Sequence, residues 1–299
     1  MSLIYLKLVL TMAFWGGTFI AGRILAQEMS PYGAALGRFA IAAIALYLWT
    51  YHRQEPLPPL KARQIFPILV LGLSGVFAYN VFFFSGLQTI PASRAGLIIA
   101  LNPVVITLCS ALFLQERLTR FKLIGTLISL VGAALVITDG QLATLLSEGI
   151  GRGELLLLGC VASWSVYSIV GRQVMKELSP VVATTYAVWV GAIALLPLAL
   201  WDRSGDGSPL TMPSVWLSLL YLGLLGTVLG FSWYYEGIQA IGPAKASIFI
   251  NLVPIFAVTF GALFLQESIT SALLLGSVLV ILGVSCVNWN LNRLQGTAS

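Results

Sequence analysis

Long apolar runs dominate the chain, and short clusters of proline, glycine and charged residues separate them. A helix of about 20 apolar residues can cross the hydrocarbon core of a bilayer, whereas the core strands of soluble proteins are shorter. The pattern predicts spans over residues 4–25, 32–51, 65–84, 93–114 and 121–138 in the first half. In the second half it predicts spans over residues 153–172, 181–201, 214–236, 244–265 and 270–290. We therefore expect an all-α integral membrane protein with ten transmembrane helices.

The composition agrees with this interpretation. Of the 299 residues, 58% are hydrophobic and only 9% are charged, and the mean hydropathy is +0.94. A typical soluble domain carries about 25% charged residues, so this chain lacks the polar side chains needed to cover a surface in water. Ten spans leave only short loops, and we expect the function to reside within the bilayer.

The sequence lacks the residues that metal sites, catalytic triads and ATP binding require. The three cysteines, Cys109, Cys160 and Cys286, lie in different spans without C-x-x-C spacing, and the one histidine, His52, lies in a loop. These residues support neither a metal site nor a Ser-His-Asp triad. No Walker motif is present, which excludes ATP as a driving force within this chain. We expect no cofactor, no metal and no enzymatic activity.

The positions of Lys and Arg predict the orientation. If the N-terminus is cytoplasmic, Arg38 falls within a span and the outer side receives only Arg23, Arg94, Arg152 and Arg203 of the 16 basic residues. The positive-inside rule then predicts that both termini are cytoplasmic. The net charge of +5 follows the membrane in this way, so it does not call for a nucleic-acid partner.

The two halves of the chain resemble each other. From Gly86 the chain reads GLQTIPASRAGLIIALNPVVITLCSALFLQERLT, and from Gly237 it reads GIQAIGPAKASIFINLVPIFAVTFGALFLQESIT. Both segments contain ALFLQE, and Trp15 and Trp164 match in the first helix of each half. The similarity predicts a duplication, with one five-helix repeat over residues 1–140 and a second over residues 150–292.

An odd number of helices per repeat requires the two copies to cross the membrane in opposite directions. Three basic residues follow the first ALFLQE between residues 117 and 122, and none follows the second over residues 268–273. This difference is expected when one loop is inside and the other outside. Inverted repeats around a central cavity are the architecture of many secondary transporters, because a pseudo-two-fold axis supplies two similar conformations open to opposite sides.

The chain resembles the drug/metabolite transporter superfamily in its ten-helix, EamA form. The resemblance covers essentially the whole chain and rests on the Trp15-Gly16 pair, on Pro31 followed seven residues later by Arg38, and on the two LFLQE copies, the first ending in Glu116. It implies a carrier of the prokaryotic inner membrane that mostly exports small metabolites such as amino acids and drug-like cations. It also implies a central cavity between helices 1 to 4 and 6 to 9. Within the superfamily, aromatic amino acid exporters look most similar.

Arg38 is predicted about seven residues into its helix, roughly 10 Å deep at about 1.5 Å per residue. A charge at this depth is costly, so we expect it to face a cavity or a partner. It could bind a substrate carboxylate or gate the outer mouth. Alternatively, it snorkels to the headgroups or pins backbone carbonyls. The second half has Ala187 at the matching position, so the two halves would be unequal.

Aromatic and polar side chains at mid-span could line the cavity. Helical spacing gathers Trp15, Thr18 and Phe19 on one face, and Trp164, Tyr167 and Ser168 on the equivalent face. Such faces could stack a planar or cationic substrate; alternatively, each Trp packs on a glycine face with its N–H bonded to a carbonyl. The full set of candidate substrate-binding residues is Trp15, Phe19, Arg38, Tyr79, Asn80, Asn102, Trp164, Tyr167, Ser168, Tyr186, Trp189 and Asn251.

Other mid-span residues suggest hinges or packing. Pro103 and Pro254 are equivalent and break a helical hydrogen bond, so we expect hinges there. Thr184 adds a polar group at depth, for cavity lining or for hydrogen bonding between helices. Glycine pairs are expected to allow close helix packing: Gly33 with Gly37, Gly226 with Gly230, Gly125 with Gly132, and Gly276 with Gly283. Glu116 and Glu267 lie at helix ends, where we expect capping or loop pairing.

The central parts of the spans contain no Asp, Glu, His or Lys. Proton relays are built from Asp, Glu and His, and Arg38 does not release its proton at accessible pH. The sequence therefore predicts a facilitator or exchanger that works by alternating access, as a monomer or a homo-oligomer. The alternative is proton-coupled efflux of drugs or organic cations. Other classes are an intramembrane enzyme, a channel and a non-transporting scaffold.

Overall fold

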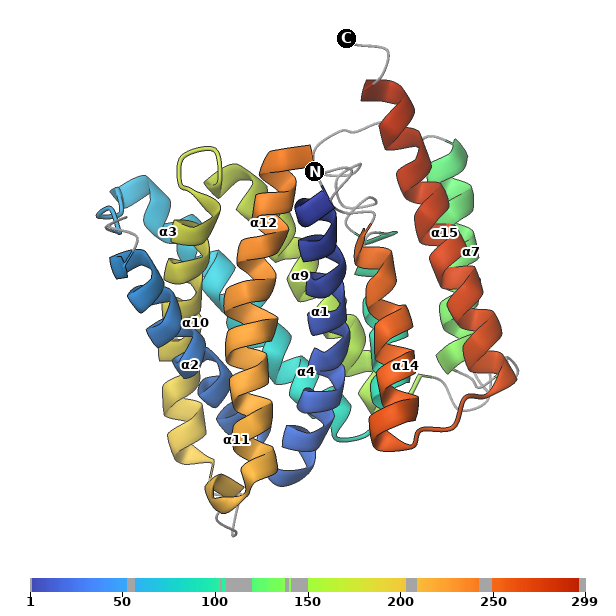
Figure 1. Ribbon diagram of the computed structural model, residues 1–299, viewed down its shortest axis with the longest axis horizontal. Coiled ribbons are helices and arrows are strands. Elements are labelled where there is room, and N and C mark those ends of the chain that lie inside the picture. Colours follow the sequence, from blue (N-terminus) through green and yellow to red (C-terminus); the bar gives the residue numbers. More distant parts are fainter. Residues whose placement is uncertain are drawn as a thin grey trace.

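The computed structural model describes residues 2–52, 57–102, 104–105, 120–137, 140, 150–202, 209–241 and 249–295. Within these ranges no residue lies in a strand, and helix occurs in each of the ten predicted spans. The chain therefore forms an all-helical bundle (Figure 1). In the part of the chain that the structure describes, six helical stretches are long and apolar enough to cross a membrane: Leu3–Glu28, Pro31–His52, Ala62–Leu87, Arg152–Gly171, Val181–Trp201 and Pro213–Tyr234.

The helices of the first half are α1 (Ser2–Glu28), α2 (Pro31–His52), α3 (Ala62–Leu71), α4 (Tyr79–Leu87), α5 (Ala92–Ile99) and α7 (Arg120–Ile137). Those of the second half are α9 (Arg152–Val174), α10 (Pro180–Trp201), α11 (Pro213–Leu220), α12 (Gly230–Ile241), α14 (Val253–Leu265) and α15 (Ser271–Gln295). The start of α1 and the end of α15 lie at the same end of the bundle (Figure 1). We call this end the N-terminal face and the other end the opposite face.

The packing between the two halves follows a symmetric pattern. Helix α1 packs against α14 and α12, and its counterpart α9 packs against α5 and α4. Two further main pairs, α2 with α10 and α7 with α15, each join a helix to its own counterpart. A two-fold axis between the halves would produce this set of neighbours. One difference breaks the pattern: α1 and α2 also pack against α4, whereas among the described residues α9 and α10 make at most marginal contact with α12.

Wide π-helical turns interrupt two equivalent helices. The segment η1 (Gly72–Ala78) joins α3 to α4, and η3 (Tyr221–Leu229) joins α11 to α12. A π-helical turn contains an extra residue, so backbone carbonyls are left for side chains to satisfy; such turns are frequent at functional sites. Both segments lie about midway along their helices.

Each segment contains a Gly-x-x-Gly pattern that allows a neighbouring helix to approach. A Cβ built on Gly75 would lie 2.2 Å from the Tyr167 ring of α9, and a Cβ on the equivalent Gly226 would lie 2.8 Å from Cγ2 of Thr18 on α1. Neither position has room for a side chain without movement of its neighbour. The equivalent glycines therefore bring η1 against α9 and η3 against α1.

The structure at Pro254 differs from the break that the sequence predicts. The sequence predicts a break within a continuous helix, but the segment η4 (Phe249–Leu252) is a 3-10 helix and α14 begins after it. Pro254 lies in the first turn of α14, where a missing N–H leaves no helical hydrogen bond unmade. In the first half α5 ends at Ile99 and a turn follows at residues 100–101, while Pro103 lies outside the described residues.

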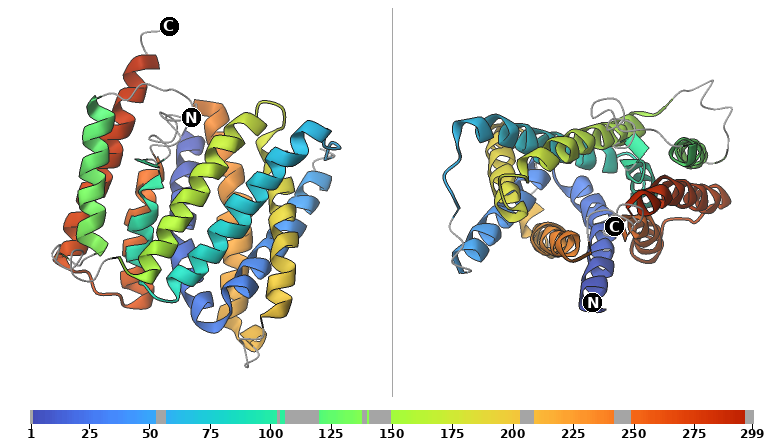
Figure 2. Two further views of the ribbon diagram at one scale, coloured as in Figure 1. Left: turned by 180° about the vertical axis from the view of Figure 1, so that it is seen from behind. Right: turned by 90° about the horizontal axis from the view of Figure 1, so that it is seen from above.

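Helices α7 and α15 form a pair at one edge of the bundle (Figure 2). A Cβ on Gly132 would lie 2.8 Å from the carbonyl oxygen of Gly276, and a Cβ on Gly283 would lie 2.5 Å from that of Gly125. The glycine pattern thus allows direct backbone contact here, as predicted. Gly33 differs, because a Cβ there would meet only Ser30 and Met29 near the start of its own helix.

Candidate substrate cavity

A cavity lies between helices of the two halves, at the depth of the η1 segment. Its empty volume is about 350 Å³ including any part continuous with the outside, and about 30 Å³ of it can hold the centre of a water molecule. Helices α2, α4, α9, α10 and α12 and the segment η1 supply the walls. The lining residues are Arg38, Phe39, Gly75, Val76, Tyr79, Asn80, Trp164, Tyr167, Thr184, Val188 and Phe231.

Arg38 is held in the cavity wall by hydrogen bonds to both halves of the chain. Its Nε donates to Oγ1 of Thr227 at 3.2 Å, and its Nη1 donates to Oδ1 of Asn80 at 3.0 Å. Only 7% of the residue is exposed, so the side chain does not snorkel to the bilayer surface. No carboxylate pairs with it in the described ranges. The guanidinium is therefore a buried cation whose hydrogen-bond partners are neutral.

The wide turns orient the two acceptors of Arg38. Nδ2 of Asn80 donates to the carbonyl oxygens of Val76 at 2.9 Å and Gly75 at 3.4 Å. The hydroxyl of Thr227 donates to the carbonyl oxygen of Leu222 at 2.8 Å, five residues earlier. Because their hydrogens satisfy carbonyls of η1 and η3, the amide oxygen and the hydroxyl oxygen remain as acceptors for Arg38. The side chain of Arg38 thus joins η1 to η3.

Aromatic rings form another part of the wall. The ring of Trp164 lies 5.0 Å from Tyr167 in a stacked arrangement, and 5.4 Å from Tyr79 and 6.2 Å from Phe231 in tilted ones. These rings come from α9, α4 and α12. A planar apolar group that enters the cavity would meet ring faces and edges at distances typical of aromatic pairs.

Thr184 brings an unsatisfied hydroxyl to the cavity. The residue is 4% exposed, and its Oγ1 has no hydrogen-bond partner among the described residues. Buried hydroxyl groups nearly always have a partner in native structures, and leaving one unpaired costs free energy. A polar group of a bound molecule, or a water, could provide that partner.

Two candidates on α1 lie beside the cavity rather than in its wall. The indole N–H of Trp15 donates to the carbonyl oxygen of Gly226 at 3.1 Å, and its ring contacts Phe231 and Tyr234. Trp15 therefore follows the second of the two expectations, in which the Trp packs on a glycine face and its N–H donates a hydrogen bond to a carbonyl. Phe19 is 3% exposed and packs edge-on against Phe83, so it belongs to the hydrophobic core.

Other candidates lie away from the cavity wall. The hydroxyl of Tyr186 donates to the carbonyl oxygen of Pro58 at 2.7 Å, and the Trp189 ring lies between Tyr186 and Tyr47. Asn102 is buried, and its Oδ1 has no partner among the described residues. The side chains of Ser168 and Asn251 lie outside what the structure describes.

Sequence reasoning missed Thr227 and Phe231, as well as the lining residues Phe39, Gly75, Val76 and Val188. Thr227 and Phe231 both lie in the eighth predicted span, where Phe231 is equivalent to Asn80 and Thr227 to Val76. The available signal was the shared Gly-x-x-Gly register of the third and eighth helices, since it places Thr227 directly after Gly226. Arg38, which Ala187 replaces in the second half, and Asn80, which Phe231 replaces, make the cavity unequal in the two halves.

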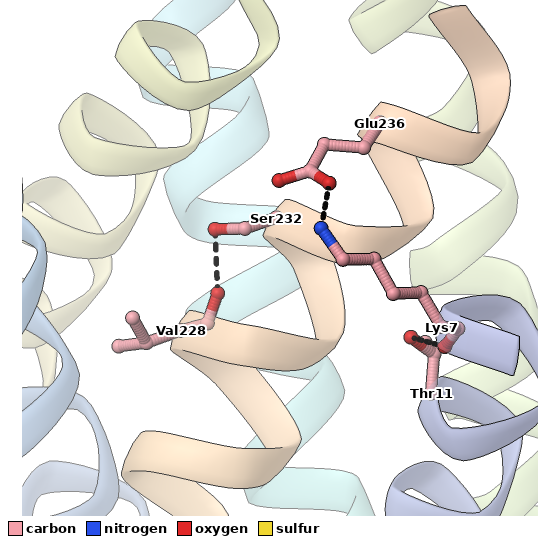
Figure 3. Close-up of polar contacts among 5 residues, drawn as sticks. All are labelled: Lys7, Thr11, Val228, Ser232 and Glu236. Atoms are coloured by element: carbon pink, nitrogen blue, oxygen red, sulfur yellow. Dashed lines mark hydrogen bonds and ion pairs between the residues drawn. The ribbon is translucent and has the colours of Figure 1, made fainter. Parts of the chain in front are cut away.

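A second polar contact joins the halves toward the N-terminal face (Figure 3). Nζ of Lys7 on α1 lies 2.5 Å from a carboxylate oxygen of Glu236 on α12, and 5.8 Å from the centre of the Trp233 ring. The Lys7 and Glu236 side chains are 25% and 35% exposed, so this pair is only partly buried. Thr11 and Ser232 bond carbonyls of their own helices nearby.

Glu267 joins the halves at the opposite face. Its carboxylate accepts hydrogen bonds from the backbone N–H of Ala92 at 2.7 Å and of Ser93 at 3.0 Å, and from the Ser93 hydroxyl at 2.5 Å. These groups begin α5, where N–H groups lack helical partners. The expected capping role is confirmed for Glu267, while Glu116 lies outside the described residues.

Comparison with known families decides the assignment. The EamA-like transporter family matches residues 2–138 and 151–289, which together are most of the chain. The chain belongs to this family. The EamA-like fold has ten membrane helices, in agreement with the helices described here. This EamA-like protein is therefore a multi-pass membrane protein, and its family and relatives indicate a transporter.

Relatives of this EamA-like protein span nearly its whole length. An uncharacterized transporter of Bacillus subtilis, YyaM, is 29% identical over 281 residues, which cover 94% of this chain and 92% of the relative. A protein of Streptantibioticus cattleyicolor named "Probable terminal-alkyne amino-acid exporter" is 29% identical over 282 residues, with coverage of 94% and 92%. A solved crystal structure with a TM-score of 0.68 and 22% identity covers 98% of this chain and 99% of its own, and it shares the fold.

Proposed function

We propose that this EamA-like transporter exports small metabolites, chiefly amino acids including aromatic ones, by alternating access of its two five-helix repeats. The observation that carries the proposal is the cavity between the halves, where aromatic rings and one buried cation form the wall. The name of the Streptantibioticus relative supports the amino-acid class. The membrane is the prokaryotic inner membrane, and both termini are cytoplasmic, as the distribution of Lys and Arg favours.

The cavity must widen before it can hold an amino acid. Ligand pockets typically measure about 300–1,000 Å³ and enclose their ligand. In this cavity only about 30 Å³ can hold the centre of a water molecule, which is room for a few waters. We infer that the halves separate on one side at a time. The interruptions before Pro254 and at the start of η1 and η3 are suitable hinges, because the helical hydrogen-bond pattern already changes there.

Uncoupled transport is the mechanism we favour. Among the residues that line the cavity none is Asp, Glu, His or Lys, so the wall contains no group that could take up and release a proton at physiological pH. The solute then moves down its own gradient, and export follows from a higher concentration inside the cell.

The alternative, proton-coupled efflux of organic cations, agrees less well with the site. A cation in the cavity would lie near the Arg38 guanidinium, and in a low-dielectric site such repulsion is strong. A channel would need a continuous pore, and an intramembrane enzyme would need a catalytic pair in the wall. The lining residues offer no such pair.

Uptake of labelled amino acids into liposomes that contain only the purified protein tests the proposal. We expect uptake to stop when the inside concentration equals the outside concentration, both without a pH gradient and with one. Protein-free liposomes are the control. Accumulation above the outside concentration, driven by a pH gradient alone, would replace the uncoupled mechanism with a proton-coupled one. No protein-dependent uptake of any amino acid would remove the amino-acid assignment.

A further inference from the structure

We infer that Arg38 binds the carboxylate of the transported molecule, and that the cavity recognises no ammonium group. The substrate class is therefore small organic carboxylates, and an amino acid is accepted for its carboxylate rather than for its zwitterion. The inference rests on the proposed transport function and deepens it.

The guanidinium of Arg38 has donors to spare. Arginine carries five N–H donors, of which Nε serves Thr227 and Nη1 serves Asn80. Within the described part of the chain, Nη2 donates to no residue. The planar fork of Nη1 and Nη2 matches the two oxygens of a carboxylate, which can accept two parallel hydrogen bonds.

The charge of Arg38 also lacks a carboxylate partner in the described ranges, and its guanidinium carbon lies 5.1 Å from the centre of the neutral Phe39 ring. The ion pairs in the described ranges join Lys7 to Glu236, Arg63 to Glu177 and Arg94 to Glu154, and none includes Arg38. A buried cation without a counter-ion is costly, because its neutral partners replace only part of the lost hydration. A bound carboxylate would supply both the missing charge and the missing acceptors.

The cavity wall contains much weaker binding partners for an ammonium group than for a carboxylate. No Asp or Glu is among the lining residues, so an amino group would meet no carboxylate there, only ring faces such as that of Trp164 and neutral oxygens such as the Thr184 hydroxyl. Cation–π contacts are weaker than a charged hydrogen bond to a carboxylate. The unpaired Thr184 hydroxyl can donate a hydrogen bond to, or accept one from, a polar group of the substrate other than its carboxylate.

Matched compounds separate the two groups. In the phenylalanine series, 3-phenylpropionate lacks the amino group and phenethylamine lacks the carboxylate. In the leucine series, 4-methylpentanoate lacks the amino group and 3-methylbutylamine lacks the carboxylate. Binding to the purified protein is measured in detergent by the shift in its unfolding temperature. We expect each acid to bind within about 10-fold of its amino acid and each amine about 100-fold more weakly, since a buried charged partner is lost.

Variants test the role of Arg38 itself. Arg38→Gln should remove most of the preference for acid over amine, and Arg38→Lys should keep part of it. Asn80→Asp places a carboxylate beside the guanidinium and should weaken acid binding while the Arg side chain remains. Lys7→Gln, which removes a cation outside the cavity, should leave the acid-to-amine ratio unchanged. A purely structural Arg38 would lower stability without changing that ratio.

The outcomes distinguish this inference from the proposed function. Acids that bind while transport is absent would support the inference and overturn the proposed function. Amines that bind as well as the acids, or no binding in either series, would overturn the inference. Wild-type protein alone decides between these results if the Arg38 variants do not fold.

Discussion

Oδ1 of Asn80 accepts a hydrogen bond from Nη1 of Arg38 across 3.0 Å. Asn80 follows the first wide turn, and the same guanidinium donates to Thr227 within the second. One cation therefore connects the wide turn η3 with the residue that follows the wide turn η1. Because the Arg38–Thr227 hydrogen bond joins the two halves at the cavity, a ligand that binds Arg38 can influence how the halves are held together.

Thr227→Val should destabilise the protein by about 1–2 kcal/mol, because the substitution removes the acceptor of Arg38 Nε and the donor to the Leu222 carbonyl. Thr227→Ser keeps the hydroxyl and should cost less than about 0.5 kcal/mol. Unfolding in mixed detergent micelles measures both. A larger loss for Thr227→Ser than for Thr227→Val would show that the methyl group of Thr227, and not its hydroxyl, matters.

Gly132→Ala should destabilise the protein by about 1–3 kcal/mol, because the new Cβ would lie 2.8 Å from backbone atoms of α15 that have no room to move. Gly33→Ala is the matched control. Its Cβ would lie 3.2 Å from the Ser30 hydroxyl, and the gain in helix propensity of about 0.5–1 kcal/mol should make it neutral or stabilising. The two unfolding free energies decide, and a neutral Gly132→Ala would contradict the packing described for α7 and α15.

Glu267→Ala should cost about 0.5–2 kcal/mol, because it leaves the first N–H groups of α5 without their acceptor. Ser268→Ala, at the exposed neighbouring position, should change stability by no more than about 0.5 kcal/mol. Hydrogen exchange at Ala92 and Ser93 gives a local readout. Unchanged protection of these amides in Glu267→Ala would argue against the cap.

The Lys7–Glu236 pair should contribute little to stability, about 0–1 kcal/mol, because both side chains are partly exposed. A double-mutant cycle with Lys7→Gln and Glu236→Gln measures the coupling free energy directly. The charge-reversed double variant, Lys7→Glu with Glu236→Lys, should recover the stability that either single reversal loses. No recovery would mean that the surroundings of each charge matter more than their contact.

Much of the fold could be predicted from the apolar periodicity alone. Helix occurs in every predicted span because the bilayer requires about 20 apolar residues with satisfied backbone groups. The wide turns at η1 and η3 could not be predicted, since no residue type specifies them. The start of α14 could not be predicted either, because Pro254 can kink the interior of a membrane helix or lie in its first turn.

The candidate site was predictable in part. The cost of a buried charge singled out Arg38, and helical spacing singled out Trp164 and Tyr167, all of which line the cavity. The same spacing argument selected Phe19, which lies in the core, because a helix face can turn toward the cavity or toward a neighbour. Only the packing of α1 against α4 and α14 distinguishes these two cases.

The most direct test of a carrier is counterflow in liposomes that contain only the purified protein, preloaded with unlabelled amino acids, at equal pH on both sides. We expect transient, saturable accumulation of labelled phenylalanine, tryptophan, threonine or leucine, and a lower rate for the Arg38→Gln variant. Such accumulation requires a site that opens to one side at a time. The absence of counterflow for folded protein, or flux that does not saturate, would contradict alternating access.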